Sequence, residues 1–171
     1  MSQEILNRVV LEEAEHKVTY KTLFSAIIFM LEHSLFAINL DYLQEIIFLK
    51  DIFRVPNTNE RLLGLINLRG SIIPVFSLKL ILGMKDHLKG KNIIKGDERY
   101  ILIIKYEKDL LGFVVDSIYK NIDVTELNYR GSEYIKNWSE NLLFDGIILD
   151  EDKEIFTISV KGLIGYLTYI K

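Results

Sequence analysis

Residues 64–78 read Gly64-Leu65-Ile66-Asn67-Leu68-Arg69-Gly70-Ser71-Ile72-Ile73-Pro74-Val75-Phe76-Ser77-Leu78. Two apolar segments in this stretch, Leu65–Leu68 and Ser71–Ser77, have the Ile, Val and Phe content that is typical of strands. The Arg69-Gly70 pair between them fits a tight turn, because Gly70 can adopt the positive φ that such a turn often requires. The stretch therefore predicts an antiparallel hairpin with Arg69 at its tip.

A short helix is expected directly after this hairpin. Ser77 can cap a helix over residues 78–82, and Gly83 can end it. Upstream, strands over residues 23–31 and 35–40 predict a first hairpin.

Two further elements are expected between these hairpins. Residues 41–47 (DYLQEII) place Leu43, Ile46 and Ile47 at helical spacing after Asp41 as a plausible N-cap, so we expect one or two helical turns there. A short strand over residues 52–55 then runs into a turn at Pro56, since proline cannot donate to a central ladder.

Downstream, residues 83–98 are polar, lysine-rich and interrupted by glycines, which indicates an exposed connection. Residues 131–141 are read as a longer polar loop that carries Trp138, and the chain ends in an expected short helix over 160–170. The strand pattern resumes after the connection, with strands expected over 100–106, 110–115, 118–124, 142–149 and 155–160.

About ten short strands in two sets predict a mostly β protein built from two small barrels packed side by side. Each barrel alone would have a marginal core, so we expect an apolar seam that both share. The expected organisation is an N-terminal extension over 1–22 and a domain over 23–167, with subdomains at about 23–82 and 99–160 joined by the polar loop 83–98.

Composition excludes several classes of function. The chain has 171 residues, a formal net charge of -3 and no cysteine. The net negative charge argues against a nucleic-acid binder, and the lack of cysteine excludes disulfides and thiolate metal sites. No run reaches the ~20 apolar residues of a membrane span, and the N-terminus lacks the order of a secretory signal, so a cytoplasmic protein is expected.

Motifs for catalysis or metal binding are missing from the sequence. His16, His33 and His87 are scattered and lack partners at ligand spacing, so surface or loop positions explain them better than a metal site. The lysine- and glycine-rich stretch 89–96 lacks the order of a phosphate-binding loop. No nucleophile motif is found, so we expect neither a catalytic residue nor a cofactor.

Arg69 is the residue that most suggests a function. An arginine at the tip of a hairpin projects into solvent from a rigid support, and its planar fork makes directional hydrogen bonds at protein interfaces. The alternative is an ordinary charged turn, and the hairpin alone leaves both possibilities open.

The residues around this hairpin resemble the CheW family, the coupling proteins of bacterial chemotaxis. The most specific match is Asn67-Leu68-Arg69-Gly70 followed by Pro74-Val75. Leu111–Ser117 (LGFVVDS) is similar to a second motif of the family, and Leu142–Gly146 with Ile158–Val160 to its closing hairpin. The resemblance covers about Leu23 to Leu167. Three positions depart from the family pattern, namely Asn59, Leu63 and Ser77, and they bear on partner choice rather than on the fold.

The resemblance implies two SH3-like five-stranded barrels and a non-enzymatic adaptor. Its partners would be the cytoplasmic tips of chemoreceptors and the regulatory domain of the histidine kinase CheA, with no nucleic acid and no direct membrane insertion. The protein would be cytoplasmic and associate with receptor arrays through these partners. The partner-binding residues that the resemblance implies are Leu43, Glu45, Ile46, Gly64, Arg69 and Gly70, with Ile101 and Leu102 in a receptor groove between the subdomains.

Within this set, Glu45 and Arg69 would set register and specificity, while Leu43 and Ile46 would form an apolar anchor. For each apolar residue the alternative is core packing.

Two other functions also stay open: a small-molecule or nucleic-acid module of OB or SH3-like type, and an enzyme with a dispersed site.

The N-terminal extension predicts a short amphipathic helix. Ile5 and Val9 are four residues apart, as are Leu6 and Val10, which would place them on one stripe. Such a short helix is marginal alone, so we expect it to be ordered only when docked on the domain or on a partner.

Overall fold

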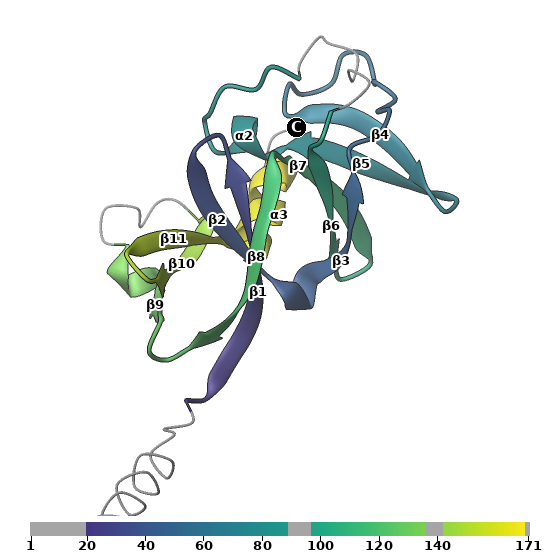
Figure 1. Ribbon diagram of the computed structural model, residues 1–171. Coiled ribbons are helices and arrows are strands. Elements are labelled where there is room, and N and C mark those ends of the chain that lie inside the picture. Colours follow the sequence, from purple (N-terminus) through teal and green to yellow (C-terminus); the bar gives the residue numbers. More distant parts are fainter. Residues whose placement is uncertain (1–19, 89–96, 136–141, 170–171) are drawn as a thin grey trace, which may run out of the picture.

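The computed structural model describes residues 20–88, 97–135 and 142–169 (Figure 1). Its strands form two sheets. The six-stranded sheet has the order β8-β1-β2-β11-β10-β9, and the five-stranded sheet has the order β3-β6-β7-β5-β4. Neighbouring strands are antiparallel except for β2 with β11 and β5 with β7, which are parallel. The expected mostly β fold with two barrel-like subdomains and short helices is confirmed, but one of the two sheets has six strands rather than the expected five.

The strands of the six-stranded sheet are β1 (Thr22–Leu31), β2 (Ser34–Asn39), β8 (Ser117–Thr125), β9 (Tyr129–Gly131), β10 (Phe144–Asp150) and β11 (Lys153–Ile158). Those of the five-stranded sheet are β3 (Leu43–Phe48), β4 (Leu62–Leu68), β5 (Ser71–Ser77), β6 (Tyr100–Tyr106) and β7 (Asp109–Val115). The helices are η1 (Leu40–Tyr42), α2 (Leu78–Ile81), η2 (Ser132–Tyr134) and α3 (Val160–Tyr169).

Strand pairing divides the chain differently from the expected subdomain ranges 23–82 and 99–160. β1 and β2 lie in the first range but pair with β8 and β11 of the second. β6 and β7 lie in the second range but pair with β3 and β5 of the first. Each sheet therefore combines strands from both ranges, because long-range strand pairing outweighs proximity along the chain.

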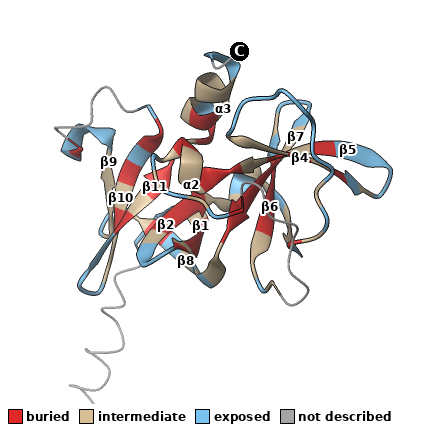
Figure 2. Cartoon of the chain, turned by 90° about the horizontal axis from the view of Figure 1, so that it is seen from above, coloured by how far each residue is buried: buried red, intermediate tan, exposed pale blue. Residues whose placement is uncertain are grey.

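The central strands are buried on both faces, and their alternation builds three cores. In β1, Ile27 and Phe29 point into a core shared by both sheets. Ala26 and Ile28 point to the other face, into a separate core lined by strands of the six-stranded sheet alone. Figure 2 shows this burial concentrated in the strands at the centre. The shared core confirms the expected apolar seam, and its members include Phe29, Phe36, Leu78, Leu102, Phe113, Phe144 and Leu163.

Helix α2 follows the expected capping. The side chain of Ser77 accepts a hydrogen bond from the backbone N–H of Leu80 at 3.1 Å and so caps α2. Gly83 follows α2 with φ +76, a left-handed conformation that ends helices. Among the residues that the structure describes, none of the helices combines the length and apolar content that crossing a membrane requires.

Three local predictions are wrong. Of the expected helix over 41–47, only residues 41 and 42 are helical, in η1, which Asn39 rather than Asp41 caps. Residues 43–47 belong to β3. The expected strand over 52–55 is reduced to one bridge between Phe53 and Leu65. Part of the expected loop 131–141 is instead taken up by the end of β9 and by η2.

Three expectations concern residues outside the described part of the chain. They are the helix within the N-terminal extension, the surroundings of Trp138, and half of the polar connection 83–98, namely residues 89–96.

Candidate functional site

The β4–β5 hairpin projects from the five-stranded sheet and places Arg69 at its tip (Figure 1). Arg69 has φ +53 and Gly70 has φ +90. Positive φ at both turn residues is the pattern of a type I′ turn, whose twist matches that of the flanking strands. The side-chain Oδ1 of Asn67 accepts a hydrogen bond from the N–H of Gly70 at 2.9 Å, which holds the turn in shape.

Arg69 and Glu45 form an ion pair. The Arg69 Nη2 donates to Glu45 Oε2 at 3.0 Å, and the side chains are 78% and 22% exposed, respectively. Glu45 lies in β3 and Arg69 follows β4, so the pair joins the two edge strands of the five-stranded sheet. An exposed pair of this kind contributes only about 0–1 kcal/mol to stability, so its main effect is to orient the guanidinium.

Lys50 adds a second link between the same edges. Its Nζ donates to the backbone oxygen of Asn67 at 2.5 Å. With the Glu45–Arg69 pair, this contact holds the hairpin against the segment that follows β3. The hairpin tip is thus a supported surface rather than a free loop.

Gly64 is buried and shapes the backbone of this region. It has φ +148, and a Cβ at this position would overlap the backbone oxygen of Phe53. Phe53 and Leu65 exchange two backbone hydrogen bonds of 2.8 Å beside it. Gly64 therefore permits the close approach of the β3–β4 connection and offers no side chain to a partner.

Leu43 and Ile46 lie in β3, partly buried against the shared core. The β3–β6 pairing shifts register between Leu43 and Glu45, which is the mark of a β-bulge. Both side chains pack on this core while part of each remains accessible at the surface.

Ile101 and Leu102 do not lie on an accessible surface. They are 0% and 1% exposed, in the core of the five-stranded sheet and in the shared core, respectively. Direct contact with a partner would require opening these cores. Core packing, the alternative that the sequence left open, accounts for both residues, and neither belongs to the candidate surface.

The sequence did not single out a partly exposed apolar row near Arg69. Phe53 pairs with Leu65 and Leu65 pairs with Pro74, so these side chains share one face, as does Ile72 two residues before Pro74. Phe53 is 69% exposed and Ile72 is 62% exposed. The sequence signal for this row was the unbroken apolar run Ile72–Val75 in β5. Because Ile73 and Val75 point into the core, Ile72 and Pro74 point to the opposite face.

We call Glu45, Arg69 and this apolar row, consisting of Phe53, Leu65, Ile72 and Pro74, the hairpin surface. Exposed apolar side chains beside an oriented arginine are typical of protein-binding sites. No group of three or more His, Asp or Glu side chains suited to a metal ion is found in the described ranges.

The sequence of this chain is similar to those of known proteins. The family model for the CheW-like domain matches residues 25–166. The chain is 33% identical over 147 residues to a protein named chemotaxis protein CheW from Thermotoga maritima, covering 81% of this chain and 91% of that protein. A chemotaxis protein CheW from Treponema pallidum is 28% identical over 123 residues, with coverage of 66% and 70%.

A solved structure supports the same similarity. The crystal structure of the scaffolding protein TtCheW from Thermoanaerobacter tengcongensis matches with a TM-score of 0.65 and 26% sequence identity. The match covers 80% of this chain and 89% of that chain.

Proposed function

Because this chain belongs to the CheW-like family, we propose that it is an adaptor of bacterial chemotaxis that couples chemoreceptors to the histidine kinase CheA. It performs no catalysis and acts by holding two partners on one rigid body. The relatives named as chemotaxis and scaffolding proteins support this function over a small-molecule or nucleic-acid module.

The observation that carries the proposal is the exposed guanidinium of Arg69, which Glu45 holds in place at the tip of the β4–β5 hairpin. Arg69 occupies the left-handed region at a turn position where Asn, Asp and Gly are preferred. This conformation costs of order 1–3 kcal/mol. It does not mark a functional site by itself, because Glu32, Glu107 and Glu151 adopt it at other hairpin turns. Glu45 holds one guanidinium nitrogen, while the largely exposed side chain keeps donors for a carboxylate of a partner.

The hairpin surface is proposed to bind the regulatory domain of CheA. Arg69 and Glu45 would set register through directional contacts, and Phe53 and Ile72 would supply apolar area at the centre. Leu43 and Ile46 would support this surface from β3. The receptor tip would bind elsewhere on the same body, so that both partners can be held at once.

A binding titration tests the proposal. The purified protein is titrated with the isolated CheA regulatory domain, with a cytoplasmic receptor fragment from the same bacterium, and with both together. We expect saturable binding of each and a ternary complex. Binding to neither would refute the adaptor function, and salt-dependent binding to DNA or RNA would favour the alternative module.

A further inference from the structure

The two sheets are connected at Asp116, which lies between β7 of the five-stranded sheet and β8 of the six-stranded sheet. Its backbone N–H donates to the oxygen of Met30 in β1 at 3.0 Å. The residue therefore ends one sheet while its backbone is already bonded to the other.

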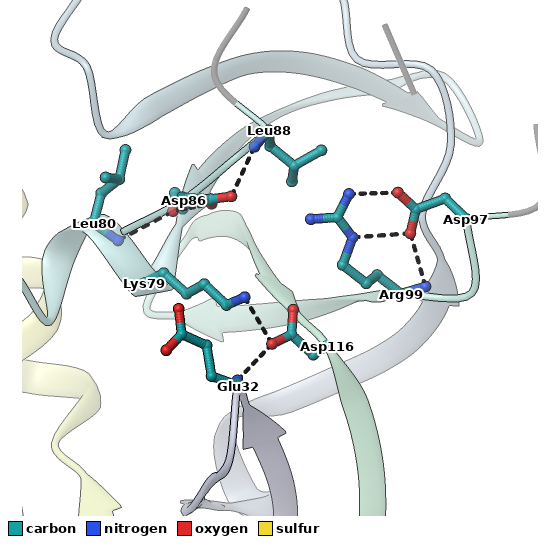
Figure 3. A network of polar contacts seen from close by, with 9 residues as sticks. Glu32, Lys79, Leu80, Asp86, Leu88, Asp97, Arg99 and Asp116 are labelled. Carbon is teal, nitrogen blue, oxygen red and sulfur yellow. Dashed lines mark hydrogen bonds and ion pairs between the residues drawn. The ribbon is translucent and has the colours of Figure 1, made fainter. Parts of the chain in front are cut away.

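The side chain of Asp116 contacts two further elements, the β1–β2 turn and helix α2 (Figure 3). Its Oδ2 accepts a hydrogen bond of 2.6 Å from the backbone N–H of Glu32, in the β1–β2 turn. The same oxygen lies 2.7 Å from Nζ of Lys79, in the α2 helix that follows β5. One carboxylate thus links a turn of the six-stranded sheet to the helix attached to the five-stranded sheet.

This ion pair is shielded from water more than an ordinary surface pair. The side chains of Lys79 and Asp116 are 14% and 25% exposed, respectively. Charge-assisted hydrogen bonds are short and directional, whereas apolar burial favours contact without a preferred direction. The shared core therefore holds the two sheets together, and the contacts of Asp116 fix the orientation of one sheet relative to the other.

We propose that Asp116 is a positioning residue that fixes the angle between the six-stranded and the five-stranded sheet. A change in this angle also transmits the effect of one bound partner on the binding of the other. This second step of the proposal rests on the proposed adaptor function. Partners bound to different parts of one body influence each other only through a change in that body.

Paired spin labels detect a change in this angle as a change in the distance between the two sheets. The labels can be placed at chosen sites because the chain has no cysteine of its own. Cysteines at the exposed Lys105 of β6 and Glu154 of β11 report the distance between the sheets. Lys79→Met keeps an apolar stem of similar length and removes the charge. We expect it to shift or broaden this distance distribution, and Asp116→Asn to do the same. A second pair, at Thr22 and Glu154 within the six-stranded sheet, should not change.

Lys120→Met is the matched control. It removes the ion pair of Lys120 with Asp150, also at 2.7 Å, which joins β8 to β10 within the six-stranded sheet. It should leave the distance between the sheets unchanged. If Asp116→Asn fails to fold, Lys79→Met decides the question. A native distance distribution in Lys79→Met, or an equal change in Lys120→Met, would overturn the proposal.

A second readout addresses the partners. In Lys79→Met, the affinity for each partner alone should stay near that of the native protein, while the factor by which one partner changes the affinity for the other falls toward unity. An unchanged factor would refute the coupling step. Failure of the native protein to bind either partner would refute the adaptor function instead, and the label distances would still test the positioning role.

Discussion

At position 69, the turn conformation and the proposed binding role favour different amino acids. The turn favours Asn, which tolerates the left-handed region, whereas partner binding as proposed requires a guanidinium. Arg69→Asn should therefore change the free energy of unfolding by no more than about 1 kcal/mol, because the lost exposed ion pair is offset by lower strain. Binding of the CheA regulatory domain, measured by calorimetry, should weaken by ~2–5 kcal/mol if a buried carboxylate of the partner is left unpaired.

Glu107 provides the matched control for this prediction. It also has φ +53, at the tip of the β6–β7 hairpin, and it is exposed. Glu107→Asn should leave the affinity for the kinase domain unchanged. Equal losses for both variants, or native affinity in Arg69→Asn, would contradict the role assigned to the guanidinium.

Asp145 gives a second prediction at the residue scale, one of pH dependence. Loss of hydration raises the pKa of its carboxyl from the usual 3.8 to about 6. The folded state therefore holds the proton more tightly than the unfolded chain. Folding is penalised once the carboxyl ionises, fully so above about pH 6, and the penalty disappears below about pH 3.8.

Asp145→Asn removes this ionisation. Asp145 as a whole residue is exposed although its carboxyl loses hydration, so we predict only the direction: a higher Tm at pH 7.5 and no gain at pH 3.5. Thermal melts at both pH values measure it. Asp152→Asn, at an exposed carboxylate of the β10–β11 turn, should give no comparable gain. A gain from Asp145→Asn that is equal at both pH values would contradict the titration.

At the scale of elements, α3 contains two glycines with opposite roles. A Cβ at Gly162 would overlap the backbone oxygen of Leu142, whereas a Cβ at Gly165 meets nothing within 4 Å. Gly162→Ala should cost about 1–3 kcal/mol or more, because the helix must move away from the chain beside it. Gly165→Ala should stabilise the protein by ~0.5–1 kcal/mol through helix propensity. Denaturant unfolding of the two variants measures both effects, and equal changes would show that the close packing of α3 is not as described.

The elements also show what the sequence could predict. The β4–β5 hairpin and the cap of α2 were predictable, because their signals lie in adjacent residues such as Gly70 and Ser77. The segment after Asp41 was read as helix because Leu43 and Ile46 lie three apart. The β-bulge in β3 explains this error, since one extra residue turns strand alternation into a spacing of three.

Part of the site was predictable only as separate residues. Glu45 and Arg69 were both named, but their contact depends on the closure of the five-stranded sheet, which local patterns do not encode. Ile101 and Leu102 were placed at a groove on the family resemblance. The sequence could not correct this, because an apolar run looks the same on a surface and in a central strand. The pairing of β1 with β8, residues nearly 100 positions apart such as Ile28 and Lys120, was likewise beyond local signals.

At the scale of the whole molecule, the shared core makes the two sheets one folding unit. Leu102 of β6 is 1% exposed and belongs to this core, together with Phe29 and Phe36 of the six-stranded sheet. The five-stranded sheet comes from one continuous segment, residues 43–115, which is inserted between β2 and β8 of the six-stranded sheet. The six-stranded sheet therefore cannot form from a continuous piece of sequence. We therefore predict one cooperative unfolding transition.

Hydrogen exchange in increasing denaturant tests this prediction, with peptides from β10–β11 and from β6–β7 reporting one sheet each. Both sets should lose protection at the same midpoint. Leu102→Ala should lower both midpoints together, at a cost of ~2–5 kcal/mol, because the cavity opens in a core that both sheets line. Separate midpoints, or a loss confined to the β6–β7 peptides, would mean that the sheets unfold independently. The core would then join two separate units, and the angle between them would depend still more on directional contacts such as that of Asp116 with Lys79.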